Sequence, residues 1–183
     1  MDNFSIVLEQ EIPRLRRYAC ALHRWNRPQA DDLVQDTLVR AIAKAHLWQA
    51  GTDIRAWLFT IMHNQHVNAV RRAVREQGTV DIEGMSSSFV ATTDPTASRQ
   101  LWELERALAR LREEQREVVL LVGLEGMSYG TAAKVLGVPI GTVRSRLSRA
   151  REALRPFMDM NGEAKSANGA SQRRPALAGD VAA

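Results

Sequence analysis

The sequence predicts an all-α fold of two small helical domains joined by a flexible linker, the second domain being a helix-turn-helix. Apolar residues recur three and four positions apart, and β-branched residues do not alternate with polar ones as they would in strands. Glycine, serine and proline interrupt this spacing between residues 78 and 96. Past residue 126, a short helix, a glycine turn and a long arginine-rich helix are expected in succession.

The first domain, residues 1–77, is expected to contain three helices. The first has apolar side chains at Ile12, Leu15, Ala19 and Leu22. The second has them at Leu33, Val34, Thr37, Leu38, Ala41, Ile42 and Ala45. The third begins at Thr52 or Asp53, either of which can accept a hydrogen bond from the free N–H groups of the first turn. It is expected to run to Gln77, with a kink or a break near His63 where the apolar stripe changes face.

The segment of residues 78–96 has the composition of a flexible linker, with two glycines, three successive serines and an Asp-Pro pair. The second domain, residues 97–158, opens with a stripe expected to face the core, formed by Leu101, Leu104, Leu108 and Leu111. The tail, residues 159–183, is expected to be disordered because it has little apolar material to offset the entropy of ordering. The two domains are expected to fold independently and to be positioned by partners rather than by each other.

The helix-turn-helix lies within residues 127–154. Ser128 is expected to cap a short helix from Tyr129 to Leu136, and Gly137 to supply the turn into a helix over 140–154. One face of the longer helix is apolar, formed by Val143, Leu147, Ala150 and Leu154. Between residues 140 and 155, five arginines (Arg144, Arg146, Arg149, Arg151 and Arg155) stand against one acid, Glu152. Because arginine can hold a guanine edge or a phosphate with two hydrogen bonds, a DNA-reading helix is favoured over a merely solvated one.

Composition and sequence patterns narrow the class of protein. Lys and Arg outnumber Asp and Glu only by 25 to 21, so the whole-chain charge alone does not indicate nucleic acid. Cys20 is the only cysteine, which excludes an internal disulfide and agrees with a reducing compartment. The acidic N-terminal segment does not resemble a signal peptide, and the longest apolar run is far shorter than the roughly 20 residues that cross a bilayer. A cytoplasmic protein without membrane insertion is expected.

Histidine and cysteine pairs raise the question of a metal site. Cys20 and His23 are three residues apart, as are His63 and His66, and two such pairs could supply four zinc ligands. Nothing in the sequence fixes the distance between the pairs, so no metal is expected and the role of this set stays open.

Three aromatic residues lie at or near the loop that precedes the third helix, namely Trp48, Trp57 and Phe59, and stacking of unpaired bases is one use of such side chains. Trp57 lies on the apolar stripe and is assigned to the core, whereas Trp48, at a helix end beside the loop, is left open between the core and base stacking.

Two stretches resemble one known family, in the family's order. LERALARLREEQREVVLLVGLEGMSYGTAAKVLGVPIGTVRSRLSRAREAL is similar to the fourth conserved region of RNA polymerase sigma factors. DDLVQDTLVRAIAKAHLW, followed by GTDIRAWLFTIMHNQHVNAVRR, is similar to the second. The pair around a linker is typical of the extracytoplasmic-function (ECF) group of the sigma-70 family, and RAWLFTIMHN resembles its alphaproteobacterial general-stress-response branch. Arg112 stands where the family often has proline, and Thr131 where a glutamate often completes a capping box with Ser128.

The resemblance implies that the polar face of the second helix docks on core RNA polymerase. Its residues are Asp31, Asp32, Gln35, Asp36 and Arg40. It also implies that the third helix and the loop before it meet the minus-ten promoter element, where a captured, flipped-out base stabilises melted DNA without ATP. These residues are Gln49, Thr52, Asp53, Asn64, Asn68, Arg71, Arg72 and Arg75.

The long basic helix is expected to read the minus-thirty-five element, with its N-terminal residues approaching a phosphate. The residues of this surface are Ile140, Gly141, Thr142, Arg144, Ser145, Ser148 and Arg149.

The sequence thus favours a sigma factor that binds core RNA polymerase and promoter DNA, is monomeric when free, and is held in check by an anti-sigma factor. The alternative is a plain helix-turn-helix regulator, which would be expected to form a dimer because such regulators double their half-sites. An enzyme with a regulatory helix-turn-helix is disfavoured, since no nucleophile–base pair or phosphate-binding glycine loop is found and no cofactor is expected. The acidic DDLVQD face favours the sigma factor over the plain helix-turn-helix regulator, because a repressor does not need such a face.

Overall fold

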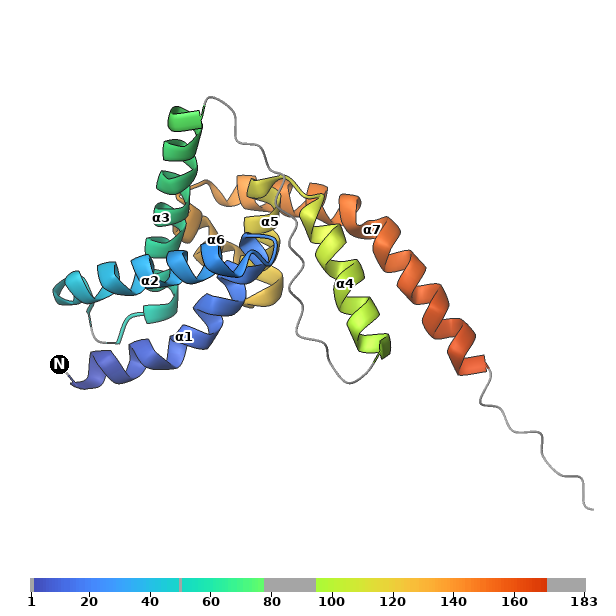
Figure 1. Ribbon diagram of the computed structural model, residues 1–183, viewed down its shortest axis with the longest axis horizontal. Coiled ribbons are helices and arrows are strands. Elements are labelled where there is room, and N and C mark those ends of the chain that lie inside the picture. The colour runs from blue at the N-terminus through green and yellow to red at the C-terminus, as the bar shows by residue number, and fades with distance from the viewer. Residues whose placement is uncertain (1, 50, 78–94, 171–183) are drawn as a thin grey trace, which may run out of the picture.

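The computed structural model describes residues 2–49, 51–77 and 95–170, and every element in these ranges is helical (Figure 1). The first domain contains α1 (Asp2–Leu22), α2 (Arg27–Ala43), the 3-10 turn η1 (Ala45–Leu47) and α3 (Ile54–Gln77). The second contains α4 (Pro95–Ala109), α5 (Glu113–Val119), the π-helical turn η2 (Leu120–Leu124), α6 (Tyr129–Leu136) and α7 (Ile140–Ala170). The all-α prediction is confirmed. Most of the predicted linker, residues 78–94, lies outside the described residues.

The first domain packs α1 and α3 against α2 around buried apolar side chains. The expected stripe of α1 is buried from Leu15 onward, whereas Ile12 is half-buried. The α3 helix is capped by Asp53 rather than Thr52, because Asp53 Oδ1 accepts a hydrogen bond from the Ala56 N–H at 3.1 Å. The break expected near His63 does not form, since α3 is continuous from Ile54 to Gln77.

The sequence predicts correctly that α6 spans Tyr129–Leu136 and that α7 begins at Ile140, but α7 runs past its expected end at residue 154. Ser128 Oγ accepts a hydrogen bond from the Thr131 N–H at 3.0 Å and lies 2.9 Å from the Thr131 hydroxyl, so threonine gives the cap a polar partner in place of a glutamate. Gly137 ends α6 with φ +62°, in the left-handed region that favours glycine. The apolar face of α7 is buried at Val143, Leu147 and Ala150.

Two expectations for the second domain are wrong. Leu108 and Leu111 are buried, but Leu101 and Leu104 are 37% and 50% exposed, because the N-terminal half of α4 extends past the helices on which its other half packs. The predicted tail begins at residue 159, yet α7 continues to Ala170. Residues 171–183 lie outside the described residues.

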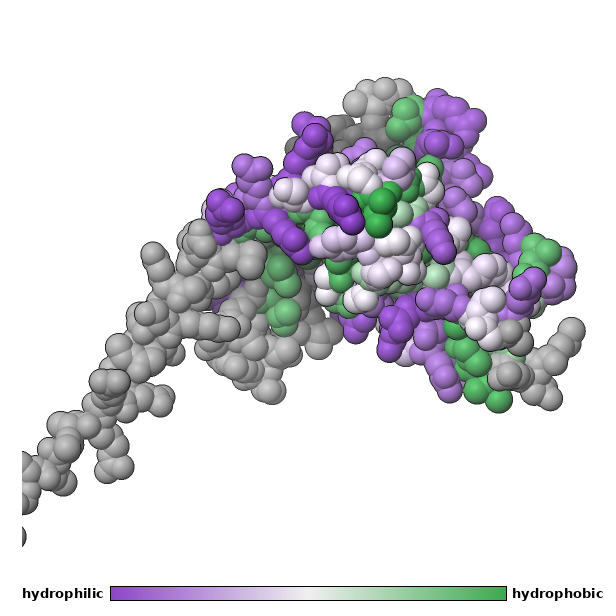
Figure 2. Space-filling model, turned by 180° about the vertical axis from the view of Figure 1, so that it is seen from behind, coloured by the Kyte–Doolittle hydropathy of each residue, from purple (hydrophilic) through white to green (hydrophobic). Residues whose placement is uncertain are grey.

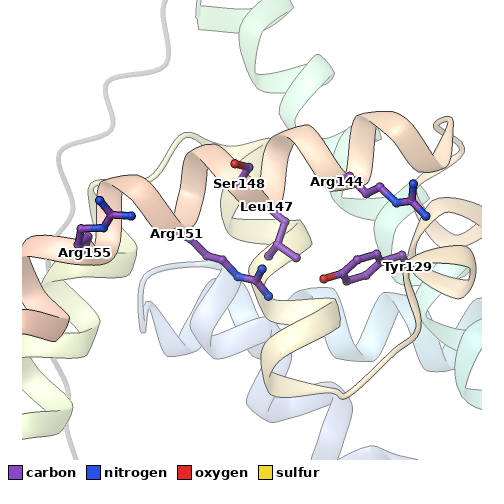
Figure 3. A pocket seen from close by; sticks show the side chains of 6 residues that line it. All are labelled: Tyr129, Arg144, Leu147, Ser148, Arg151 and Arg155. Atoms are coloured by element: carbon purple, nitrogen blue, oxygen red, sulfur yellow. The ribbon is translucent and has the colours of Figure 1, made fainter.

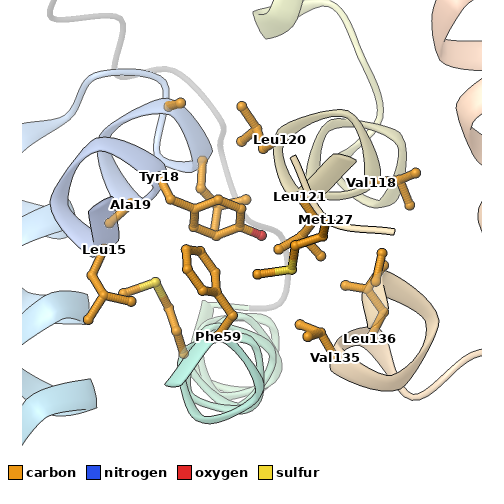
Figure 4. Close-up of a cluster of buried hydrophobic side chains, with 14 of the residues drawn as sticks. Leu15, Tyr18, Ala19, Phe59, Val118, Leu120, Leu121, Met127, Val135 and Leu136 are labelled. Carbon is orange, nitrogen blue, oxygen red and sulfur yellow. The ribbon is translucent and has the colours of Figure 1, made fainter. Parts of the chain in front are cut away.

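The two domains pack directly on each other, which corrects the expectation that only partners would position them. Tyr18 of α1 and Phe59 of α3 meet edge to face, with ring centroids 4.9 Å apart. Figure 4 shows these rings facing Leu121, Met127 and Val135 of the second domain, so a single apolar cluster spans both halves of the chain. Burial and the nearby Glu117 and Glu125 carboxylates raise the pKa of Tyr18, whose hydroxyl therefore remains neutral in the cluster. The α2 helix leaves some apolar side chains of α1 and α3 uncovered. The second domain covers them and so removes their apolar surface from water.

Hydrogen bonds between side chains also connect the domains. Arg17 Nη2 donates to Glu125 Oε1 at 2.8 Å, and the Glu125 side chain is fully buried. Arg55 Nη1 donates to the Glu125 backbone carbonyl at 3.0 Å. His63 Nδ1 lies 2.8 Å from Glu117 Oε1, and His66 Nε2 is hydrogen-bonded to Glu113 Oε1. Three carboxylates of the second domain thus meet basic or imidazole side chains of the first.

Candidate nucleic-acid interface

The polar face of α2 is fully available to a partner. All five residues predicted for core docking (Asp31, Asp32, Gln35, Asp36 and Arg40) are exposed. On the opposite face Val34 and Ala41 are buried, which fixes the rotation of the helix about its axis. Asn26 begins α2 by accepting a hydrogen bond from the Gln29 N–H at 3.2 Å, so the acidic residues lie in well-ordered turns near its start. The structure thus brings the predicted residues together on one accessible surface.

The predicted minus-ten residues of α3 form a second exposed surface. Asn64, Asn68, Arg71, Arg72 and Arg75 all lie on the solvent side of the helix. This half of α3 protrudes beyond the other helices in Figure 1, and Figure 2 shows mainly hydrophilic side chains around it at the upper right. Arg75 Nε donates to the Arg71 carbonyl at 3.2 Å, which orders one of the guanidinium groups along the helix. Amides and arginines so arranged can contact bases and phosphates together.

The loop before α3 is held by its own polar side chains. Thr52 Oγ1 donates to the Gln49 carbonyl at 2.7 Å, while Asp53 caps the helix. Gly51 has φ +91°, a conformation that favours glycine at this turn. Gln49, Thr52 and Asp53 are all exposed, so the described part of the loop presents polar groups on a constrained backbone.

Trp48 packs against the fold beside this loop. Its ring lies 5.6 Å from that of Phe4, and Trp57 approaches the same Phe4 ring at 6.1 Å. The Trp48 Nε1 atom is buried and has no hydrogen-bond partner among the described residues. Both tryptophans are half-buried, so Trp57 is assigned correctly to packing and Trp48 belongs mainly with it rather than on an open stacking surface.

The predicted reading face of α7 is the third exposed surface. Ile140, Gly141, Arg144, Ser145, Ser148 and Arg149 are exposed and Thr142 is half-buried. Ser145 Oγ donates to the Thr142 carbonyl at 3.0 Å, which holds the first turns of the helix in register. Because Val143, Leu147 and Ala150 anchor the opposite side, the free face carries arginine forks and small hydroxyl groups that suit base edges and phosphates.

Sequence reasoning missed several polar residues that the structure brings together. Tyr129, Arg151 and Arg155 line a cleft on the flank of α7, together with Arg144 and Ser148. In the sequence, Arg144, Arg151 and Arg155 are seven and four positions apart, a spacing that predicts one shared flank of a helix. Only the fold shows that Tyr129 lies beside them (Figure 3).

Of the set Cys20, His23, His63 and His66, the three histidines lie at or beside the boundary between the domains. The His23 and His66 rings meet edge to face with centroids 5.1 Å apart, while the imidazoles of His63 and His66 bond to carboxylates across the domain boundary. Burial lowers the pKa of His23 to about 4, with a further contribution from His66. Burial raises the pKa of the Cys20 thiol, which disfavours the thiolate that binds metals. Among the described residues, there is no group of three or more histidine, cysteine, aspartate or glutamate side chains that could hold a metal ion.

The described helices contain no segment long and apolar enough to span a membrane.

The all-α fold, with its helix-turn-helix in the second half, and the sequence comparisons define the same class of protein, an RNA polymerase sigma factor. Residues 101–154 match the sigma-70 region 4 family, and residues 8–63 match the Sigma2 domain of PhyR. The chain is 39% identical over 155 residues to the ECF RNA polymerase sigma factor EcfG of Rhodopseudomonas palustris, with 82% of each chain covered. It is 37% identical over 163 residues to the ECF RNA polymerase sigma factor SigC of Mycobacterium tuberculosis, covering 84% of this chain and 80% of the relative.

A solved structure shares the whole architecture. The sigma factor RpoE from Bartonella quintana, in complex with the anti-sigma factor NepR, superposes with a TM-score of 0.75 at 36% identity, covering 87% of this chain and 98% of the relative. The chain belongs to the ECF RNA polymerase sigma factors. It binds core RNA polymerase and directs promoter-specific initiation of transcription.

Proposed function

We propose that this sigma factor divides its task among three surfaces: the polar face of α2 docks on core polymerase, the exposed side of α3 with its preceding loop engages the minus-ten element, and α7 reads the minus-thirty-five element. The proposal rests on the exposure of these three surfaces to solvent. Of the residues that sequence reasoning assigned to these surfaces, all but the half-buried Thr142 are exposed. Core packing uses the opposite face of each helix, so the surfaces can bind without unfolding the domains.

The α2 surface suits a protein partner of complementary charge. Asp31, Asp32 and Asp36 with Arg40 form a mixed but mainly acidic face whose only described ion pair is the weak one between Asp31 and Arg16, at 3.9 Å. Charged faces of this kind steer association and set specificity more than they add affinity.

The α3 surface suits DNA that is opening. Its arginines attract the phosphate backbone, while Asn64 and Asn68 offer amide donors and acceptors to base edges. Unstacking a base costs about a few kcal/mol, so a constrained loop that holds the flipped base favours the melted state without any chemical step. In this proposal the protein carries out no catalysis and needs no cofactor.

The docked domains must separate for both promoter elements to be bound at once. The elements are named for positions about 25 base pairs apart, or roughly 85 Å of duplex at 3.4 Å per pair. A compact chain of this size has a radius of gyration of only about 16 Å. We therefore propose that binding of the chain to core polymerase and promoter exchanges the interface between the domains for contacts with polymerase and DNA.

An anti-sigma factor is the natural antagonist in this scheme, and the complex of the Bartonella quintana relative with NepR supports one here. Exposed Leu101, Trp102 and Leu104 on α4 give a protein partner apolar side chains to cover. We expect the protein to act in the cytoplasm, because it works together with RNA polymerase. We expect a monomer, because a single chain carries the surfaces proposed for both promoter elements.

The test is run-off transcription with purified core polymerase and a library of genomic fragments as template, with and without the full chain. Discrete transcripts that depend on the chain are expected. Retention of DNA binding by a dimer, with no transcription that depends on the chain, would support the plain helix-turn-helix regulator instead.

A further inference from the structure

The turn between α1 and α2, residues 23–26, has an unusual backbone. Arg24 has φ +52° and Trp25 has φ +62°, and no other non-glycine residue that the structure describes has a positive φ. An L-amino acid in this left-handed region brings its Cβ atom close to the following carbonyl oxygen, so glycine or asparagine usually occupies such positions. Two successive larger residues in this region make the turn a strained segment.

Hydrogen bonds around the turn show how it ends α1. The Trp25 N–H donates to the Cys20 carbonyl at 2.7 Å, and the Asn26 N–H donates to the His23 carbonyl at 3.0 Å. The first of these bonds is the one that closes a Schellman motif, in which the left-handed position falls here on Arg24. A backbone conformation that glycine adopts without strain is thus imposed on an arginine.

The second domain packs where this turn leaves α1. Figure 1 shows the end of α1 beside α5, and Arg116 Nη1 of α5 donates to the Leu22 carbonyl at 3.2 Å. The His23 ring meets the His66 ring edge to face, and His66 is hydrogen-bonded to Glu113, the first residue of α5. Two side chains of α5 therefore hold, directly or through His66, the helix end from which the turn departs.

Like charges also meet at this place. Burial first, and then the charge of Arg24, lower the pKa of Arg116 to about 10, although the Glu113 and Glu117 carboxylates act in the opposite direction. Docking of the second domain thus places two cations near each other beside the strained backbone. The turn combines two unfavourable features at the point where the second domain packs on the first.

We propose that residues 23–26 form a strained hinge: docking of the second domain holds Arg24 and Trp25 left-handed, and separation of the domains lets them relax. The hinge rests on the proposed exchange of the domain interface for contacts with polymerase and DNA. Strain in the hinge offsets part of the docking free energy, so core polymerase separates the domains more easily. A hinge without strain would hold the domains together more firmly and leave a smaller fraction of the chain open for binding.

Arg24→Gly and Arg24→Ala test the hinge as a matched pair in the full chain. Both variants remove the same side chain and the same charge, but only glycine adopts the left-handed conformation without strain. The difference between the two variants therefore measures the effect of the backbone. Arg24→Asn should fall between them, because asparagine tolerates this conformation better than alanine does. Circular dichroism confirms that all three variants keep the parental helix content.

The first measurement is binding to purified core polymerase. The glycine variant is expected to bind about fivefold more weakly than the alanine variant, because relief of the strain favours the docked state by about that factor. Equal binding by the two variants, or tighter binding by the glycine variant, overturns the hinge.

The second measurement needs no polymerase. Arg17→Ala, which is expected to loosen the docked domains, is added to both variants, and small-angle scattering should then show a smaller radius of gyration with glycine than with alanine. Equal radii would mean that the strain does not depend on docking and would overturn the hinge. The outcomes are separable from the proposed function: if the parent binds core polymerase and the matched pair binds equally, only the hinge is wrong. If the parent does not bind core polymerase while glycine restores compactness, only the proposed function is wrong.

Discussion

Arg116 Nη1, in α5, donates a hydrogen bond to the backbone carbonyl of Leu22, the last residue of α1, at 3.2 Å. The same guanidinium donates to the carbonyls of Leu108 and Leu111 at 3.0 and 2.9 Å. Arg116 is only 4% exposed, and burial lowers its pKa to about 10, so it remains charged at neutral pH. One buried cation therefore satisfies helix-end and turn carbonyls from both domains.

Arg116→Ala is expected to reduce the free energy of unfolding by about 3–5 kcal/mol, since it leaves several buried carbonyls without donors. Chemical denaturation with circular dichroism measures the loss. Arg116→Lys should recover part of it, because an ammonium reaches fewer of the acceptors. A loss below about 1 kcal/mol, within the range of an ordinary surface change, would show that the carbonyls are satisfied in another way.

Arg17→Ala is expected to weaken the docking of the two domains, since it leaves the buried Glu125 carboxylate without its cation. Small-angle scattering should then show a larger radius of gyration, with the helical content unchanged. Arg16→Ala is the matched control, because Arg16 is the adjacent residue and its only described ion pair, to Asp31 at 3.9 Å, lies within the first domain. Equal compactness of the two variants would remove the Arg17–Glu125 pair from the docking interface.

Acid is expected to destabilise the fold through His23. Its folded pKa of about 4 lies below the ordinary value of 6.5, so the unfolded chain binds more protons between these values and stability falls as pH falls through that window. The depressed pKa of Glu113, caused first by its hydrogen bond from His66, acts in the same direction. For His23 alone, the free energy of unfolding should be about 2 kcal/mol lower at pH 5 than at pH 7.5.

His23→Gln removes the titrating group while keeping a polar side chain beside His66, Glu113 and Arg116, and it should flatten the dependence on pH. Denaturation of both proteins between pH 4.5 and 7.5 measures the difference. A parallel decline in the two proteins would assign the acid sensitivity to other groups.

Asp32→Ala combined with Asp36→Ala is expected to weaken binding to core polymerase, because the variant lacks two exposed carboxylates of the docking face. Co-purification with core measures binding, and circular dichroism confirms the fold. Glu9→Ala with Glu114→Ala removes two exposed carboxylates elsewhere and should bind as the parent does. Should the two double variants bind equally well, the α2 surface has been assigned wrongly.

Arg149→Ala is expected to cost on the order of 1–3 kcal/mol at the cognate upstream element, and much less on unrelated DNA, if the side chain holds a base with two hydrogen bonds. Comparative footprinting on promoter and unrelated duplexes measures both losses. A uniform loss on all sequences would make Arg149 a phosphate contact.

Local chemistry explains which parts of the fold the sequence could predict. Ser128 and Gly137 set the ends of α6 through interactions within a few residues, so the bounds of α6 could be predicted to the residue. Exposure of the α2 and α7 surfaces followed from helical spacing, because the apolar residues on the opposite side had to be buried.

The remainder depends on contacts between distant residues. Leu101 and Leu104 follow a core-like spacing, and only the length of the helices packed beside them decides that they are exposed. The bonds of His63 and His66 to carboxylates of α5 depend on how the two domains dock, which no periodicity within either domain specifies.

The polar side-chain pairs that join the two domains are asymmetric. In the three described side-chain pairs that cross the boundary, every carboxylate (Glu113, Glu117 and Glu125) belongs to the second domain, and every partner (Arg17, His63 and His66) to the first. The two halves therefore contact each other through a specific set of polar side chains that another sigma factor need not share. A chimera that joins residues 1–77 to the second domain of a paralogue could keep every residue that is proposed to contact DNA and still lose the docked arrangement of the two domains. The domains of two sigma factors are therefore not interchangeable.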